Sequence, residues 1–192
     1  RNGTLFDMPA VTMQEQRQED RHTLAERCEK VAGLLEHSER AVAWCQLNSE
    51  SELLKRLIPG AVEIKGGDSP DAKEEALVAF GRGDIRVLVT KPSIAGWGLN
   101  WQHCHRMTFF PSHSYEQYYQ AVRRCWRFGQ TEPVTVDVIT TEGGVNVVKN
   151  LTRKAGQADR MFEALVTHMN EGVSIRRDID YPEKVEVPSW LS

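Results

Sequence analysis

The stretch AVAWCQ, from Ala41 to Gln46, decides how the rest of the sequence is understood. It is a continuous apolar run of strand length, which is typical of a strand buried on both faces. Downstream of it, strand-like and helix-like segments alternate. Strands are predicted at 61–64, 86–90, 106–110 and 134–139, and helices at 51–57, 70–80 and 114–128. This alternation favours a parallel sheet with helices on both faces, so the expected fold class is α/β.

The segments that flank this core have a different character. Upstream, a charged and glutamine-rich helix is predicted over 13–37, with an apolar stripe that includes Cys28 and Leu35. Downstream, a helical stretch over about 145–169 is expected to break near Gly156. The first helix either docks on the core or bridges to another part of a longer protein. We divide the chain into a lead-in and helix over 1–38, a core domain over 39–170 and an irregular tail over 171–192.

The composition limits the classes of protein that fit. The chain has 192 residues, of which 40% are hydrophobic and 27% are charged, with a net charge of −3. This composition supports a globular core and excludes a wholly disordered chain. The longest apolar run, Ala41–Cys45, is far shorter than the roughly 18 residues of a membrane span, so no membrane partner is expected. Because basic residues are not in excess, any nucleic acid must be bound by a local patch.

The cysteines indicate a cytoplasmic location. All four are scattered and none forms a C-x-x-C pair, so we expect reduced thiols, with Cys125 buried and inert. The run His103-Cys104-His105 resembles a metal cluster, but consecutive side chains of a strand point to opposite faces and no fourth ligand is near. No metal site is therefore predicted. The sequence begins with Arg1 rather than Met, and we expect it to be part of a longer polypeptide.

Two predicted loops follow strands, at the sheet edge where α/β proteins place their ligands. The first reads KGGD from Lys65, and its glycines permit a close backbone approach; an ordinary turn before a helix is an equally good interpretation. The second reads TKPSIAGWGLN from Thr90 to Asn100. Its hydroxyls, lysine and glycines suit contact with phosphate, although no G-K-[ST] phosphate loop is present.

The helix over 114–128 carries the strongest pattern. At helical spacing, Gln120, Arg124 and Arg127 share one narrow stripe, and we expect them at the same carboxyl edge of the sheet. The opposite stripe, which includes Tyr119 and Trp126, is expected to pack against the core. Guanidinium groups suit the charge of a transferring phosphoryl group. A solvated basic face is the plain alternative.

The order and spacing of two motifs resemble a known family. Residues 120–130 read Q-A-x-x-R-x-x-R-x-G-Q, and the preceding loop reads A-G-W-G-L-N, one glycine fewer than the family's A-G-G-x-G-L-N. Over about 41–139, the chain resembles the second RecA-like lobe of superfamily two helicases. It is most similar to the Swi/Snf-like DNA-translocating ATPases of phage and prophage type. This resemblance implies a RecA-like parallel sheet of about five to six strands.

The resemblance also implies a function. It indicates the motor lobe of an ATP-dependent DNA helicase or translocase, with ATP and Mg²⁺ bound mainly by a first RecA-like lobe of the same polypeptide. The implied catalytic residues are Gln120, Arg124 and Arg127, the two arginines acting as arginine fingers. The implied nucleotide contacts are Gly98 and Asn100. The implied contacts with the DNA backbone, which are sequence-independent, are Lys65, Gly66, Thr90, Lys91 and Ser93. The chain alone is expected to be inactive as an ATPase.

An alternative function uses the same fold without the chemistry. The chain would then be a non-catalytic module that binds nucleic acid or docks a partner. The spacing of Gln120, Arg124 and Arg127 favours the motor, because a binding module does not need it. Trp97 and Trp101 either stack on bases or pack within the lobe.

Overall fold

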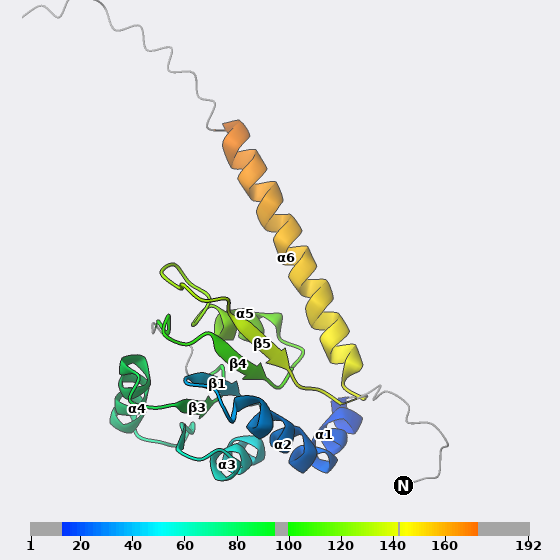
Figure 1. Ribbon diagram of the computed structural model, residues 1–192. Helices are drawn as coiled ribbons and strands as arrows, with labels where there is room; N and C mark the ends of the chain where they lie inside the picture. The colour runs from blue at the N-terminus through cyan, green and yellow to red at the C-terminus, as the bar shows by residue number, and fades with distance from the viewer. Residues whose placement is uncertain (1–12, 95–99, 142, 173–192) are drawn as a thin grey trace, which may run out of the picture. The chain divides into compact units, whose positions relative to one another are not determined.

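The computed structural model describes residues 13–94, 100–141 and 143–172 (Figure 1). The helices are α1 (Met13–His22), α2 (Leu24–Leu35), α3 (Asn48–Leu57), α4 (Pro70–Arg82), α5 (Tyr115–Val122) and α6 (Val145–Gly172). The strands are β1 (Ala41–Trp44), β2 (Ala61–Glu63), β3 (Val87–Thr90), β4 (Arg106–Phe109) and β5 (Thr135–Val138). The chain forms two units that divide after Ala155, within α6, and the sheet belongs to the first. Among the described residues, no helix has both the length and the apolar character needed to cross a bilayer.

The five strands form one parallel sheet in the order β2-β3-β1-β4-β5. β1 lies at its centre, where Ala43 pairs with Val89 of β3 and with Thr108 of β4. All four residues of β1 are buried, as the AVAWCQ stretch predicts. The predicted α/β class, with a parallel sheet of about five strands, is confirmed.

Each face of the sheet has its own hydrophobic core, because successive strand side chains point in opposite directions. On one face, Trp44 belongs to a cluster with Phe80 of α4 and Ala121 of α5. On the other face, Ala43 belongs to a cluster that includes residues of α2 and α3, such as Leu54. Helices therefore cover both faces, with α5 and α2 on opposite sides of the sheet (Figure 1).

The N-terminal helical segment docks on this core. The single helix predicted over 13–37 is two helices, because Thr23 leaves the helical conformation with φ −96° and ψ 8°. Arg27 of α2 is only 5% exposed, and its Nη1 donates to Glu50 Oε1 of α3 at 2.8 Å. Its Nη2 donates to the carbonyl of Asp20 at 2.7 Å. This buried ion pair and the apolar stripe of α2 fix the helix to the lobe.

One predicted helix end and one predicted helix break are wrong. The helix expected to run to Phe128 ends at Val122. The break expected near Gly156 is absent, and α6 continues through that residue to Gly172. A glycine inside a helix costs about 1 kcal/mol relative to alanine, which a long helix tolerates.

Candidate nucleotide-contacting site

α5 leads into a turn rich in arginine, residues 123–130, which we call the arginine turn. The helix begins after Ser114, whose Oγ accepts a hydrogen bond from the Gln117 amide at 3.3 Å. Beyond Val122 the chain turns, and Gly129 takes a φ of 89°, a conformation that favours glycine. The three side chains predicted to share a helical stripe therefore come from two local structures, with Gln120 on the helix and both arginines on the turn.

The packed face of α5 differs from the prediction. Tyr119 and Trp126, expected against the core, are 45% and 56% exposed. Val122 of the predicted stripe does pack against the core, together with Tyr118, Ala121 and Cys125, and the buried thiol of Cys125 confirms that part of the prediction. Trp126 lies past the end of α5, where the chain no longer rotates by about 100° per residue. Tyr119 lies within α5, and its exposure shows that the stripe assigned to the core was displaced from the one that packs, which includes Tyr118 and Ala121.

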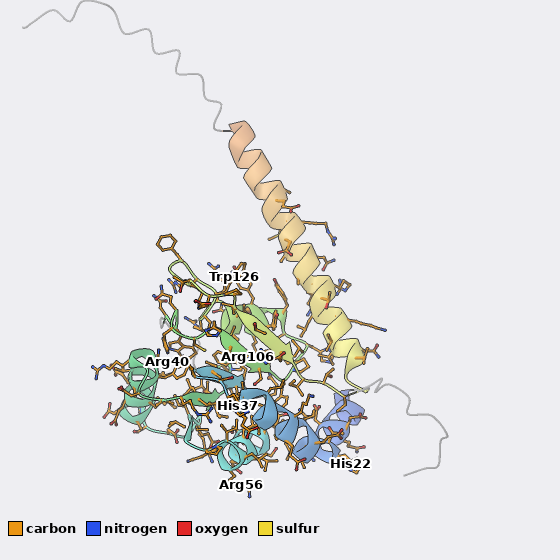
Figure 2. The ribbon with its side chains drawn as sticks, viewed as in Figure 1. His22, His37, Arg40, Arg56, Arg106 and Trp126 are labelled. Atoms are coloured by element: carbon orange, nitrogen blue, oxygen red, sulfur yellow. The ribbon has the colours of Figure 1, made fainter. Side chains whose placement is uncertain are left out.

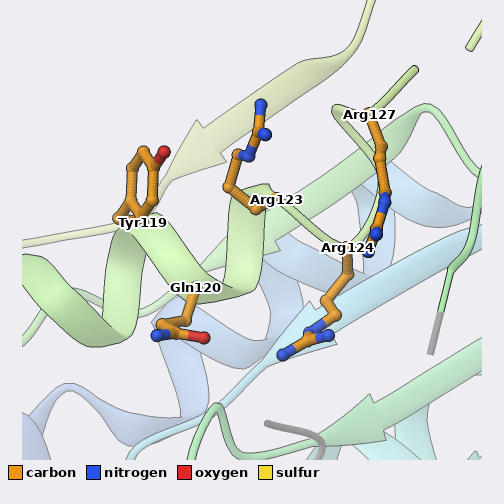
Figure 3. Close-up of a pocket in the computed structure, with 5 residues that line it drawn as sticks. All are labelled: Tyr119, Gln120, Arg123, Arg124 and Arg127. Carbon is orange, nitrogen blue, oxygen red and sulfur yellow. The ribbon is translucent and has the colours of Figure 1, made fainter. Parts of the chain in front are cut away.

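The three predicted catalytic side chains nevertheless meet in space. A pocket of about 370 Å³ is lined by Tyr119, Gln120, Arg123, Arg124 and Arg127 (Figure 3). In Figure 3, Gln120 and Arg124 project to one side of α5, whereas Tyr119 and Arg123 project to the other. The volume falls within the range of small-molecule sites, about 300–1,000 Å³.

The pocket is strongly cationic. Arg124 is 8% exposed, and burial lowers the pKa of its guanidinium, with a further lowering from the nearby charge of Arg127. Arginine stays charged at neutral pH, so the two positive charges persist side by side. A bound anion would relieve both the desolvation and the repulsion. The pocket therefore fits the oxygens of a phosphate chain.

No metal-binding arrangement accompanies these cations. The pocket lining contains no carboxylate. Across the residues that the structure describes, no three His, Cys, Asp or Glu side chains gather as a metal site. The residues of this pocket do not fit Mg²⁺, which binds to carboxylates and substrate phosphates.

Sequence reasoning missed two members of the pocket. The guanidinium of Arg123 lies 5.9 Å from the ring centre of Tyr119 and 5.5 Å from that of Trp126. Such cation–π contacts hold Arg123 along an exposed row of rings. The signal was present in the spacing, since Arg123 follows Tyr119 by four residues, one helical turn.

The arginine turn and the predicted DNA contacts adjoin different segments of the chain. Lys65 and Lys91 follow the carboxyl ends of β2 and β3. The arginine turn instead bonds the segment that enters β4, where the Trp101 amide donates to the Arg124 carbonyl at 2.8 Å. The backbone of the arginine turn therefore lies beside the segment that leads into β4, and not beside the loops that follow β2 and β3.

The loop after β2 is held by ion pairs. The Nζ of Lys65 lies 2.9 Å from Glu52 Oε1 and 3.6 Å from Glu63 Oε2. The hydrogen bond to Glu52 raises the pKa of Lys65, so its charge is secure. The carbonyl of Gly66 accepts a hydrogen bond from Lys73 Nζ at 2.6 Å. Both predicted contacts are near the surface, but Lys65 must share its charge with two carboxylates.

In the loop after β3, the predicted DNA contacts differ in how far their side chains are exposed. Thr90 is fully buried, and its hydroxyl donates to the Ile64 carbonyl at 3.3 Å. Lys91 is half-buried and Ser93 is exposed. Thr90 therefore stabilises the junction of β2 and β3. Of the predicted contacts in this loop, Lys91 and Ser93 have side chains at the surface.

The predicted nucleotide contacts are only partly described. Gly98 and Trp97 lie outside the described residues, whereas Asn100 is exposed. Trp101 is fully buried, stacks on Trp44 with ring centres 5.8 Å apart, and meets the edge of Phe80. Of the two roles left open for Trp101, the structure favours packing within the lobe.

Comparisons with known proteins identify the fold. The family model described as helicase conserved C-terminal domain matches residues 25–129. The crystal structure of the C-terminal part of the Fun30 ATPase domain aligns with a TM-score of 0.54 and 16% identity, over 60% of this chain and 41% of that one. The C-terminal domain of the DEAD-box protein Dbp5 aligns with a TM-score of 0.58 and 14% identity, over 69% and 80%. At these identities the likeness shows the fold alone. No match was found among curated proteins.

Proposed function

The chain belongs to the family of helicase conserved C-terminal domains, and from this we propose that it is the C-terminal motor lobe of an ATP-dependent DNA helicase or translocase, Swi/Snf-like and of phage or prophage type. The observation that carries the proposal is the pocket in which Gln120, Arg124 and Arg127 meet. Two guanidiniums and an amide, with no carboxylate, form a lining that suits a phosphate chain.

In this proposal the nucleotide reaches the lobe from outside. ATP with Mg²⁺ is held mainly by a first RecA-like lobe of the same polypeptide, and Arg124 and Arg127 act on its phosphates as arginine fingers. Gln120 lies beside them and orients the reacting groups. Gly98 and Asn100 contact the sugar and phosphates. An arginine finger accelerates phosphoryl transfer by a factor of about 10³–10⁵. Because ATP is held mainly by the first lobe, we expect this chain by itself to be inactive.

The DNA backbone is gripped by the loops that follow β2 and β3. Lys65, Lys91 and Ser93 supply charge and a hydroxyl near the surface, while Gly66 offers exposed backbone and Thr90 fixes the loop. Contacts of this kind carry no base information, so binding is sequence-independent and falls with added salt. We place the protein in the cytoplasm, where the scattered thiols stay reduced.

A partner-docking module is the second candidate, and one observation favours it. Tyr119 and Trp126 are exposed with Arg123 between them, and Phe128 is 97% exposed. Tyrosine, tryptophan and arginine are the residues that most often anchor protein interfaces. In this alternative the arginine turn binds a partner and has no effect on ATP turnover.

DNA-stimulated ATPase activity of the full-length protein separates the two functions. We expect Arg127→Ala to lower kcat by about 10³-fold or more while leaving the Kd for duplex DNA unchanged. The matched control for turnover is Arg56→Ala, which removes an exposed arginine of α3 that does not line the pocket (Figure 2) and which we expect to keep the wild-type kcat. Normal turnover in the Arg127 variant would remove the motor proposal and leave the docking module.

A further inference from the structure

The arginine turn is not helical, so contacts outside a helix must fix its shape. The Trp101 amide donates to the Arg124 carbonyl at 2.8 Å. The side chain of Gln102 donates from Nε2 to the Phe128 carbonyl at 2.7 Å. Both residues belong to the segment that enters β4. These bonds hold the two ends of the turn, but neither holds its middle, where Cys125 lies.

Gln130 holds the middle of the turn. Its Nε2 donates to the carbonyl of Cys125 at 3.3 Å and to the carbonyl of Cys104 at 3.1 Å, just before β4. Its Oε1 accepts from the Glu132 amide at 3.0 Å, and its own amide donates to the Arg127 carbonyl at 3.0 Å. Every polar group of this side chain is therefore engaged, and its orientation is fixed.

The position of Cys125 explains why the hydrogen bonds of Gln130 affect the two arginines. Its carbonyl lies between Arg124 and Arg127, and its side chain is fully buried in the core. The amide of Gln130 ties this carbonyl to that of Cys104, alongside a hydrogen bond between the thiols of Cys104 and Cys125, and so fixes the backbone from which both guanidiniums project. A displacement of about 1 Å in a reacting group can cost about 10²-fold in rate.

We infer that Gln130 is a positioning residue, which sets the two guanidiniums toward the phosphates by joining the Cys125 and Cys104 carbonyls. It acts through the backbone, and its side chain is not among the groups that line the pocket. The inference rests on the proposed function, because it presumes that Arg124 and Arg127 contact ATP. Its distinctive requirement is a hydrogen-bond donor at position 130.

Two substitutions distinguish the role of the hydrogen-bond donor of Gln130 from the role of its acceptor. Gln130→Glu has nearly the same shape and keeps an acceptor for the Glu132 amide, but its carboxylate cannot donate to the two carbonyls. Gln130→Lys loses the acceptor but carries three N–H donors that can reach them. A role in packing alone predicts that Glu, the closer match in shape, is tolerated better than Lys. The positioning role predicts the reverse order.

The test uses the full-length protein, with duplex DNA and ATP. We expect Gln130→Glu to lower kcat by about 10- to 10²-fold with KM for ATP and Kd for DNA unchanged, and Gln130→Lys to stay within about threefold of wild type. Hydrogen–deuterium exchange should show faster exchange over 123–130 in the Glu variant and unchanged protection of β1. Wild-type turnover in the Glu variant, or equal losses in both variants, would overturn the inference.

Arg127→Ala, measured in parallel, distinguishes this failure from failure of the proposed function. If Arg127→Ala abolishes turnover and Gln130→Glu does not reduce it, only the positioning role of Gln130 is wrong. If Arg127→Ala is fully active, the motor proposal itself fails.

Discussion

The arginine turn and the strand-end loops reach their positions by different physical routes. The loops after β2 and β3 meet because neighbouring parallel strands end at one edge, which any sheet of this order would achieve. The strand order does not determine the position of the arginine turn, which depends instead on hydrogen bonds made by Trp101, Gln102 and Gln130. Under the proposed function, this contrast predicts that substitutions in the two regions separate DNA binding from ATP turnover.

After Arg127→Ala, the largest expected effect is at Arg124. In Arg124→Lys the positive charge is retained, but the planar fork that can bind two phosphate oxygens is lost. We expect kcat of the full-length ATPase to fall by about 10²–10³-fold, with little change in the affinity for DNA. Steady-state ATPase assays and DNA titrations at one salt concentration measure both quantities.

The outcome at Arg124 also tests whether charge or geometry matters at the arginine turn. Full activity of Arg124→Lys would show that a point charge is sufficient there. A matched loss of DNA affinity would show that the arginine turn and the strand-end loops form one surface, and the comparison between them would fail.

Lys91 should show the opposite behaviour. Lys91→Ala removes a half-buried cation beside the end of β3, and we expect weaker DNA binding with a salt slope reduced by about 1. kcat at saturating DNA should stay unchanged, because the arginine turn is untouched. The effect of Lys65→Ala should be smaller, since Lys65 is already paired with Glu52 and Glu63. Equal salt slopes in the wild type and the Lys91 variant would remove this residue from the DNA contacts.

The sequence predicted most of what depends on periodicity. The apolar run of β1 and its alternation with helices were enough for the sheet, because burial on both faces leaves a strong pattern. Thr90 shows the limit of this reasoning. The predicted strand and β3 both end at this residue, yet the sequence did not reveal that its hydroxyl is buried and bonded to the Ile64 carbonyl of the neighbouring chain segment.

The arginine turn shows a different limit. The grouping of Gln120, Arg124 and Arg127 was predicted for a reason that the structure contradicts, since α5 ends before either arginine. No local pattern reveals that Gln130 bonds to the Cys104 carbonyl, 26 residues away along the chain. Contacts between distant segments leave no periodic signal in a single sequence, so the shape of a turn is the last feature that can be inferred from it.

The smallest expected effect is a pH dependence that distinguishes the two regions. His103 lies between Gln102 and Cys104, both of which hold the arginine turn. Burial and the nearby charge of Arg40 lower the pKa of His103 below its ordinary value. The unfolded chain therefore binds the proton more readily than the folded lobe does.

The free energy of unfolding should consequently fall as the pH drops through about 6.5, the ordinary histidine value, and level off once folded His103 is also protonated. Urea denaturation at pH 7.5 and 5.5 measures this change, which His103→Gln should reduce and His37→Gln, at an exposed histidine, should not. At the lower pH, protection against hydrogen exchange, taken relative to the intrinsic rate at each pH, should fall over 123–130 before it falls over 61–66. An equal loss of protection in both segments would mean that the segment entering β4 does not determine the stability of the arginine turn.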